Sequence, residues 1–410
     1  MNEQYRSLAI TAANPRTQIA IHTFAHELAS HGSGAGAILA AAEADPDCAL
    51  ANAYAAATCL TLMTREGQQR ASKPLALALS GAASSSREQQ TIAAVAAWHG
   101  GDTAKAAGIL RGVVEMWPHD LAALKLCQIL EIGLGDVAGM LQTSGMAAAV
   151  EGRSSYALGL HAFALEQAGE TDLAMRLARR AIDLNPGMDP WAEHVVAHVL
   201  AARQQPVEGR SFLRAHSAAW NRCSSFMLTH NWWHLALFEL ELDSAPAAFD
   251  LLIERVWGVR KEHSQDQINA ISLLARIEIN GIRAPHIWDE IAHHVEARCD
   301  DRMRVFLDLH YLYALAKAGR DSKVRDMLGR FDPQSLGGAL AHGVAAHAKR
   351  EYMLAASKIS PYRRDLQALG GSNVQRELFE LIFADSVIHC RDSLAMRKRV
   401  KPAAAFDVAA

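Results

Sequence analysis

A glycine followed by an acidic residue recurs at intervals of 34 residues in the first half of the chain. The three pairs, together with two prolines at twice that interval, are Gly101-Asp102, Gly135-Asp136, Gly169-Glu170, Pro118 and Pro186. An interval of 34 residues is typical of tetratricopeptide repeats, in which each unit is a hairpin of two helices. Glycine suits the turn within a hairpin, and proline suits the point at which the second helix ends. The spacing therefore predicts a stack of helical hairpins.

Small side chains favour the same structure. Ala162, Ala174, Ala178 and Ala181 stand where the two helices of one hairpin must touch. Helical patterns continue on both sides with looser spacing, and no alternating run of Val, Ile and Thr indicates a strand. We therefore expect an all-α protein, an α-solenoid of tetratricopeptide-like helical hairpins that curves around a concave groove.

One continuous solenoid in three parts is the expected organisation. N-terminal helical hairpins occupy residues 1–80, a tetratricopeptide-like repeat core with a histidine-rich centre occupies residues 81–320, and C-terminal helices with a tail occupy residues 321–410. No segment between these parts has the length or composition of an interdomain linker.

The composition narrows the classes of partner. Lys and Arg number 41 against 44 Asp and Glu, so no strong positive field attracts nucleic acid or an anionic membrane. The first residues lack a basic and apolar leader, and no apolar run reaches the length of a membrane span. The six cysteines are scattered, which indicates neither a disulfide framework nor a thiolate zinc site. We expect a cytoplasmic protein that binds neither nucleic acid nor membrane.

Histidine is abundant, with 19 residues, and its spacing is informative. His194 with His198, and His230 with His234, stand four residues apart on two successive predicted helices. That spacing places two imidazoles on one helix face, where they can hold one metal ion. We expect antiparallel packing of the two helices to bring the four imidazoles together.

A purely structural interpretation of these histidines stays open. A buried histidine often only hydrogen-bonds a neighbouring carbonyl or carboxylate, and tryptophans such as Trp232 and Trp233 are commonly helix-packing core. A third pair, His22 and His26, has the same spacing, but nothing in the sequence brings it near the others. Spacing alone therefore does not decide between a site and a core.

Four strings between residues 155 and 320 are more specific than the repeat itself. They are HAFALEQAGETDLAMRLARRAIDLNP (161–186), DPWAEHVVAHVL (189–200), THNWWHLALFELE (229–241) and DLHYLYALAKAGR (308–320). In this order they resemble the tetratricopeptide repeat protein 38-like family of bacterial and animal proteins. The string HNWWHLAL is distinctive, whereas the repeat residues are common. The resemblance implies a helical-repeat fold and no particular reaction.

The resemblance also implies which polar residues mark the family. They are His161, His194, His198, His230, His234 and His310, with acidic residues at Asp250 and Asp308. The chain departs from the family pattern at Asn269, where the resemblance leads us to expect an acidic residue. This departure counts against any role that requires a carboxylate at that position.

One hypothesis is a metal- or histidine-dependent enzyme whose buried pocket binds a small molecule inside a helical shell. The expected metal ligands are His194, His198, His230 and His234. The ion would be zinc, copper, nickel or iron, all of which imidazole suits. The expected catalytic residues, acting as general acid, general base or orienting carboxylate, are His161, His310 and Asp308. The expected pocket residues are Trp232, Trp233, His216 and Asp250. A metal-free version would use paired histidines for proton transfer.

The alternative hypothesis is a non-catalytic scaffold, the common role of helical repeats. Its groove would bind a peptide or protein segment, with Trp232 and Trp233 as apolar anchors. Inward-facing histidines around a closed cavity favour the pocket, and an open groove favours the scaffold. No residue indicates an oligomeric state.

Overall fold

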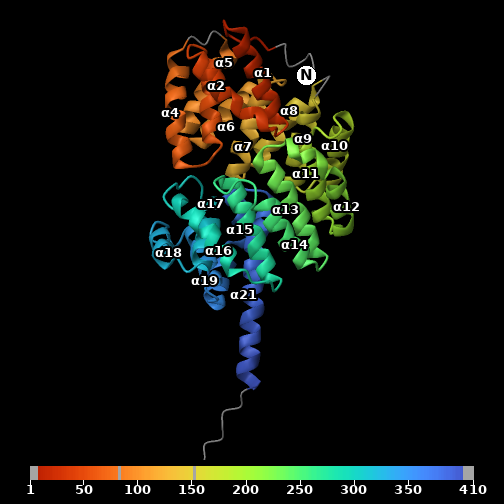
Figure 1. Ribbon diagram of the computed structural model, residues 1–410, viewed down its shortest axis with the longest axis vertical. Helices are drawn as coiled ribbons and strands as arrows, with labels where there is room; N and C mark the ends of the chain where they lie inside the picture. The colour runs from red at the N-terminus through yellow and green to blue at the C-terminus, as the bar shows by residue number, and fades with distance from the viewer. Residues whose placement is uncertain (1–7, 82–84, 151–153, 400–410) are drawn as a thin grey trace, which may run out of the picture.

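The computed structural model describes residues 8–81, 85–150 and 154–399, with side chains described as far as residue 391. Over these ranges the chain forms 21 α-helices and no strand, and the helices stack as successive hairpins (Figure 1). The predicted all-α, solenoid-like fold is confirmed. None of the described helices combines the length and the apolar character that crossing a bilayer requires.

The helices follow one another with short connections. In the first half they are α1 (Pro15–Ala29), α2 (Ala37–Ala44), α3 (Ala49–Leu60), α4 (Arg65–Ser80), α5 (Ser86–His99), α6 (Thr103–Met116), α7 (Leu121–Leu134), α8 (Val137–Ala149), α9 (Ser155–Gln167) and α10 (Thr171–Leu184). In the second half they are α11 (Pro190–Ala202), α12 (Pro206–His216), α13 (Ser225–Glu241), α14 (Ala245–Leu251), α15 (Ser264–Ile279), α16 (Pro285–Val295), α17 (Val305–Lys317), α18 (Asp321–Leu328), α19 (Leu336–Ala348), α20 (Tyr352–Ile359) and α21 (Asn373–Arg399). The short 3₁₀ and π segments between them are η2 (Ser33–Gly36), η3 (Ser217–Arg222), η4 (Leu252–Val256), η5 (Glu296–Arg298) and η6 (Ser360–Leu369).

The recurring glycine–acid pairs sit at the turns of three hairpins. Gly101, Gly135 and Gly169 have φ values of 87°, 70° and 87°, the left-handed region that glycine adopts without strain. The aspartates that follow the first two glycines cap the next helix: the Asp102 carboxylate accepts the amide of Lys105, and Asp136 likewise caps α8. The 34-residue period therefore marks both the turn of each hairpin and the start of the helix that follows it.

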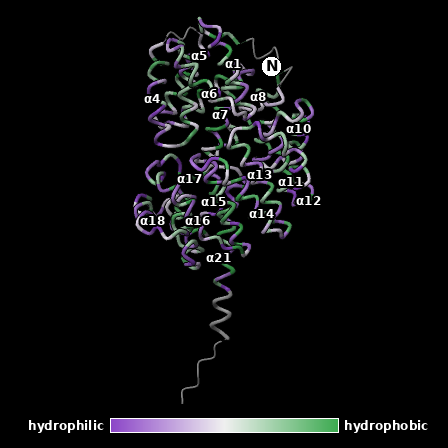
Figure 2. Tube along the Cα trace, viewed as in Figure 1, coloured by the Kyte–Doolittle hydropathy of each residue, from purple (hydrophilic) through white to green (hydrophobic). Residues whose placement is uncertain are grey.

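The helices form two layers that differ in burial. We call α3, α7, α9, α11, α13, α15, α17 and α19 the inner helices, because most of their residues are buried. We call α4, α6, α8, α10, α12, α14, α16, α18 and α20 the outer helices, because each exposes one face. Figure 2 shows hydrophilic stretches along α4 and α18 at the outside of the molecule. The four alanines predicted to lie between α9 and α10 are all fully buried.

The solenoid is closed rather than open, because segments of its two halves contact each other across the centre. The hydrogen bonds that join them are Ser224 N to the carbonyl of His31 (2.7 Å), Ser264 Oγ to the carbonyl of Leu62 (2.6 Å), Gly371 N to the carbonyl of Ile132 (3.2 Å) and Gln367 Nε2 to the carbonyl of Gly135 (2.9 Å). The hydrophobic core forms two large clusters, and α13 contributes to both. The predicted boundaries near residues 80 and 320 stay a prediction.

Candidate metal centre

The two predicted histidine pairs meet between α11 and α13. His194, His198, His230 and His234 each offer one ring nitrogen, and these four atoms lie within 4.8 Å of one another. The exposed fractions of the four residues are 1%, 0%, 3% and 1%. The sequence prediction that the two pairs come together is confirmed.

The packing of the two helices differs from the antiparallel arrangement that we expected. The ring centroids of His194 and His230 are 4.9 Å apart, and those of His198 and His234 are 4.7 Å apart. His31 contacts both Trp191 at the start of α11 and Phe226 at the start of α13, so the two helices begin on the same side and run in the same direction. Because α12 connects α11 to α13, the chain reverses its direction twice between them.

Three of the ring nitrogens crowd together. Nε2 of His194 lies 3.0 Å from Nε2 of His198 and 3.1 Å from Nε2 of His230. A neutral imidazole carries one proton on its two nitrogens, so the identity of the protonated nitrogen decides whether these contacts are hydrogen bonds. The partners of the opposite nitrogen, Nδ1, therefore determine the character of the cluster.

Nδ1 of His230 faces an acceptor that a hydrogen-bond chain holds in place. The Thr229 hydroxyl donates to Oδ1 of Asp266 at 2.9 Å and therefore accepts from the amide nitrogen of Asn269 at 3.4 Å. This leaves Oδ1 of Asn269 pointing at Nδ1 of His230, 3.1 Å away. The residue that replaces the expected acid thus presents a carbonyl oxygen, which places the proton of His230 on Nδ1.

Nδ1 of His198 faces a buried carboxylate. It lies 3.1 Å from Oε2 of Glu166, the last acidic residue of α9, although the angle between them is not that of a hydrogen bond. A carboxylate beside an imidazole nitrogen favours a proton on that nitrogen. Both His198 and His230 therefore direct an unprotonated Nε2 at Nε2 of His194. A neutral His194 with its proton on Nε2 can satisfy one of these two lone pairs, whereas a metal ion can satisfy both.

Burial opposes a positive charge on these imidazoles. Removal from water, followed by the charges of neighbouring imidazoles, lowers the pKa of His194 and His234 well below the usual value. Burial also lowers the pKa of His230 to about 3, although Asn269 acts in the opposite direction. Near neutral pH these three imidazoles are uncharged, and their lone pairs are available to a metal ion.

Aromatic rings surround the imidazoles and exclude water. Trp233 stacks on His230 with 5.1 Å between centroids and 9° between planes. Trp191 lies 4.6 Å from the ring of His194, and Phe163 contacts the same ring from α9. Among the described residues, Nδ1 of His194 and Nε2 of His234 have no hydrogen-bond partner. Both atoms lie in an apolar environment where an unpaired polar group is costly.

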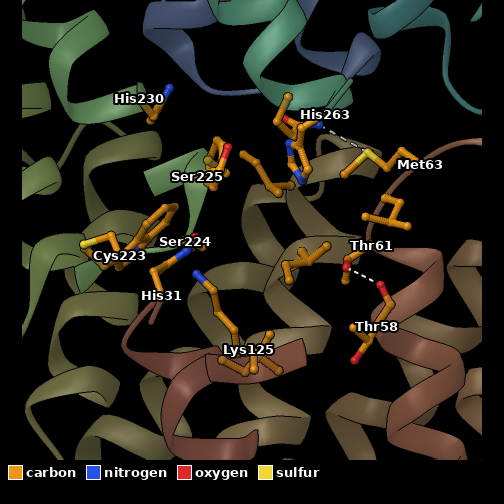
Figure 3. A pocket seen from close by; sticks show the side chains of 18 of the residues that line it. His31, Thr58, Thr61, Met63, Lys125, Cys223, Ser224, Ser225, His230 and His263 are labelled. Atoms are coloured by element: carbon orange, nitrogen blue, oxygen red, sulfur yellow. Dashed lines mark hydrogen bonds between the residues drawn. The ribbon is translucent and has the colours of Figure 1, made fainter. Parts of the chain in front are cut away.

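A cavity of about 820 Å³ borders the cluster. His194 and His230 form part of its wall, whereas His198 and His234 lie behind them. Figure 3 shows that the wall is assembled from distant segments, with Lys125 and His31 on one side and His230 and His263 on another. The cavity lies beside the closing contacts, and His31, Leu62 and Ile132 form part of its wall.

The three predicted catalytic residues lie outside the four-histidine group. His161 on α9 contacts Ser144 of α8, with 3.0 Å between Nδ1 and Oγ. Nδ1 of His310 on α17 donates to the carbonyl of Phe306 at 2.7 Å. Asp308, two residues before His310, has its pKa raised to about 7, mainly by burial and then by the charge of Asp301. A catalytic role for His161, His310 and Asp308 stays a prediction.

The four predicted pocket residues lie in different environments. Trp233 is fully buried against His230, and Trp232 packs edge-on to Trp220 at 5.2 Å. His216 bonds to the carbonyl of Phe212 at the end of α12. Asp250 is exposed on α14. None of Trp232, Trp233, His216 and Asp250 is among the described residues that line the cavity. Their contact with a ligand stays a prediction.

Sequence analysis missed the residues that orient and flank the cluster. Glu166 was visible only as part of a repeat-like helix, and its burial beside His198 depends on the packing of α9 against α11. Lys125 and His31 lie far from the histidine pairs in sequence, and no motif marks them. The one available signal for Glu166 was an acidic residue within a mainly apolar predicted helix. A search against models of known protein families finds no match for this chain.

Proposed function

We propose that the four histidines bind a divalent transition metal ion and that the protein acts on a small molecule held in the adjoining cavity. The observation that carries this proposal is the geometry of His194 and His230. Their nitrogens belong to the four-histidine group while their rings form part of the cavity wall. A centre used only for packing has no need of such access.

The spacing of the nitrogens suits a metal ion after a small adjustment. Zinc–nitrogen bonds of about 2.0–2.1 Å place tetrahedral ligand atoms roughly 3.3–3.4 Å apart. The observed contacts at His194 are 3.0 and 3.1 Å. The four ligand atoms span up to 4.8 Å, so the closest rings would move outward and the most distant one inward to admit the ion. Four neutral imidazoles suit zinc, copper, nickel or iron.

The chain's own residues would support such a centre in distinct ways. Glu166 and Asn269 fix the two imidazoles whose Nδ1 atoms they face. Trp233 and Phe163 keep water from the rings, which strengthens electrostatic interactions at the site. A bound transition metal that kept one coordination position open would polarise a substrate oxygen or lower the pKa of a bound water. His194 and His230 are the ligands nearest to that substrate.

Closure of the solenoid supports a small-molecule site over the peptide-binding scaffold. A peptide groove needs an open concave face. Here the carbonyls of His31, Leu62 and Ile132 accept hydrogen bonds from segments of the second half, and these contacts cover part of the centre. The cavity volume of about 820 Å³ lies in the range of small-molecule sites.

We also propose kinship with the tetratricopeptide repeat protein 38-like family. The support is the order of the four resembling strings, which fall on α9–α10, α11, α13 and α17. Three of these inner helices carry the four-histidine group and Glu166. The strings and the proposed centre therefore coincide.

Elemental analysis tests the proposed function directly. Tag-free protein purified without chelator should contain about one transition metal ion per chain, and His194→Ala and His234→Ala should lose it. The matched control is His216→Ala, since this histidine lies at the end of an outer helix and contacts Phe212. Far-ultraviolet circular dichroism of each variant should show retained helicity.

The contradicting result is equally clear. A wild-type protein that stays empty after incubation with zinc, copper, nickel and ferrous iron in turn would refute the metal centre. Loss of metal from His216→Ala as well would attribute the effect to general loosening rather than to ligation.

A further inference from the structure

One buried cation in the cavity has no counter-charge in contact with it. Lys125 lies in the middle of the inner helix α7, its side chain is 2% exposed, and it lines the cavity. It forms no ion pair and no hydrogen bond with any described residue. Its Nζ instead lies 3.7 Å from the ring centroid of Trp191. The carboxylate of Asp189 attracts it only from beyond ion-pair distance.

A second polar atom without a partner lies beside it. The ring of His31 stacks on Trp191 at 4.8 Å, and its Nε2 is buried with no hydrogen-bond partner among the described residues. The backbone of His31 has a φ of 53°, in the left-handed region. Figure 3 shows Lys125 and His31 directing nitrogen atoms into the same part of the cavity. Trp191 also contacts the ring of His194, so one aromatic ring separates Lys125 from the histidine cluster.

The cavity wall carries an excess of positive charge. Its cationic residues are Arg70, Lys125, Arg260 and Arg304, and its one carboxylate among the described lining residues is Glu27. Glu27 already accepts the amide of Gly34 at 2.8 Å. Arg260 and Arg304, like Lys125, form no ion pair with a described residue. The remaining wall is largely apolar, including Phe163, Phe226 and Phe306.

A buried ammonium without a counter-ion is energetically unfavourable. Desolvation accordingly lowers the pKa of Lys125 to about 7, and Asp189 offsets this only in part. A ligand carboxylate or phosphate would supply both the missing charge and the acceptors for the three N–H groups of the side chain. The same unpaired lysine would have little reason to be buried in an inner helix for packing alone.

We propose that the cavity takes an amphiphilic organic anion, whose charged group binds Lys125 and His31 and whose apolar body lies against the phenylalanines. The position of Trp191 then directs the rest of the molecule toward His194 and His230. This last step rests on the proposed function, because it makes the histidine centre the place where the bound molecule reacts. The anion site itself depends only on Lys125 and its surroundings.

Calorimetric titration with octanoate, octyl phosphate and the neutral octanamide tests the proposal. Metal-loaded and chelator-treated proteins are both titrated, because a carboxylate also binds a metal directly. We expect at least one anion to bind at least about tenfold more tightly than octanamide. Lys125→Gln should weaken that binding by a similar factor in both proteins. The better anion of the two identifies the head group.

Lys105→Gln is the matched control, since Lys105 is exposed on the outer helix α6. It should bind the anions as the wild type does. If Lys125→Gln fails to fold, Lys125→Met provides an uncharged side chain of similar length that suits a buried position. Equal anion binding by wild type and the Lys125 variant, or no anion binding at all, overturns the proposal.

The two proposals fail separately. A protein that contains metal but binds octanoate and octyl phosphate independently of Lys125 retains the metal centre and loses the anion site. A protein that contains no metal but binds an anion through Lys125 retains the anion site and loses the metal centre.

Discussion

The helices α11 and α12 belong to one hairpin but differ in almost every physical respect. Eleven of the residues of α11 are buried, among them His194 and His198. Within the fully described α12, only Gly209 and Leu213 are buried, and His216 at its end is half-buried. The inner helix is almost fully buried, so its polar groups lose water and an unpaired one is costly. The outer helix contributes packing on one face and solubility on the other.

Histidines on the N-terminal helix α1 extend this comparison. His22 and His26 have the same four-residue spacing as the central pairs, but both are half-buried. His26 contacts the hydroxyl of Tyr156 at 3.2 Å and lies near Glu27. The spacing that contributes to a buried four-histidine group on α11 and α13 is found on α1 with half-buried rings. What matters is a second pair facing the first inside the protein.

The largest expected effect separates an inner from an outer histidine through metal-linked stability. Zinc at about a thousand times its dissociation constant should raise the free energy of unfolding of the wild type by about 4 kcal/mol. His234→Ala should abolish this increase and His216→Ala should retain it. Urea unfolding with and without zinc measures the difference. Equal zinc-induced increases in the free energy of unfolding of both variants would show that the inner and outer histidines do not differ in metal binding.

A second effect concerns pH. Burial, with Arg276 adding to it, lowers the pKa of His310 on α17 to about 4, although the carbonyl of Phe306 acts in the opposite direction. The unfolded chain binds a proton there below about 6.5, and the folded protein does so only near 4. Stability linked to His310 is therefore present above pH 6.5 and is lost as pH falls toward 4.

This linkage amounts to about 3 kcal/mol in total. The measurement is the free energy of unfolding against pH for wild type and His310→Gln. The gap between the two curves should narrow by this amount as pH falls from 6.5 to 4. Curves that stay parallel would show that His310 titrates normally in the folded protein.

A third effect is expected at the carboxylate that faces His198. Glu166→Gln removes the charge while keeping the shape, and it should weaken metal affinity about 10- to 100-fold. Competition with a chelator of known affinity measures this change. An unchanged affinity would show that Glu166 does not orient the imidazole, despite the 3.1 Å separation.

The smallest effect is expected in the outer layer. Glu208 of α12 and Arg179 of α10 form an ion pair of 3.4 Å between half-exposed side chains. Glu208→Gln should change the free energy of unfolding by less than about 1 kcal/mol and leave metal affinity unchanged. Thermal and urea unfolding check the first expectation, and the chelator competition checks the second. A larger loss would assign the outer layer a structural role that its exposure does not suggest.

The sequence was sufficient to predict what depends on neighbours along the chain. Gly101, Gly135 and Gly169 marked turns, because their conformation is a local requirement. The pairs on α11 and α13 were predictable because helical geometry alone aligns residues four apart. The meeting of the two pairs was a further inference from hairpin stacking, and it held although the direction of packing did not.

Features that depend on contacts between distant segments were not predictable. Glu166 faces His198 only because α9 packs beside α11. Lys125 becomes a cavity residue only when the chain closes around it. No local pattern encodes closure, since each closing hydrogen bond joins a backbone carbonyl to a segment far away in sequence.

Closure also sets an order of events during synthesis. The four histidines and Lys125 precede the segment that bonds to Ile132 and Gly135, and the bond between Gln367 and Gly135 spans 232 residues. At ordinary rates of translation this segment leaves the ribosome on the order of ten seconds after the histidines. A metal ion can therefore reach the centre of the nascent chain while one side is still open. In the finished protein, this C-terminal segment is bonded to Ile132 and Gly135 across that side.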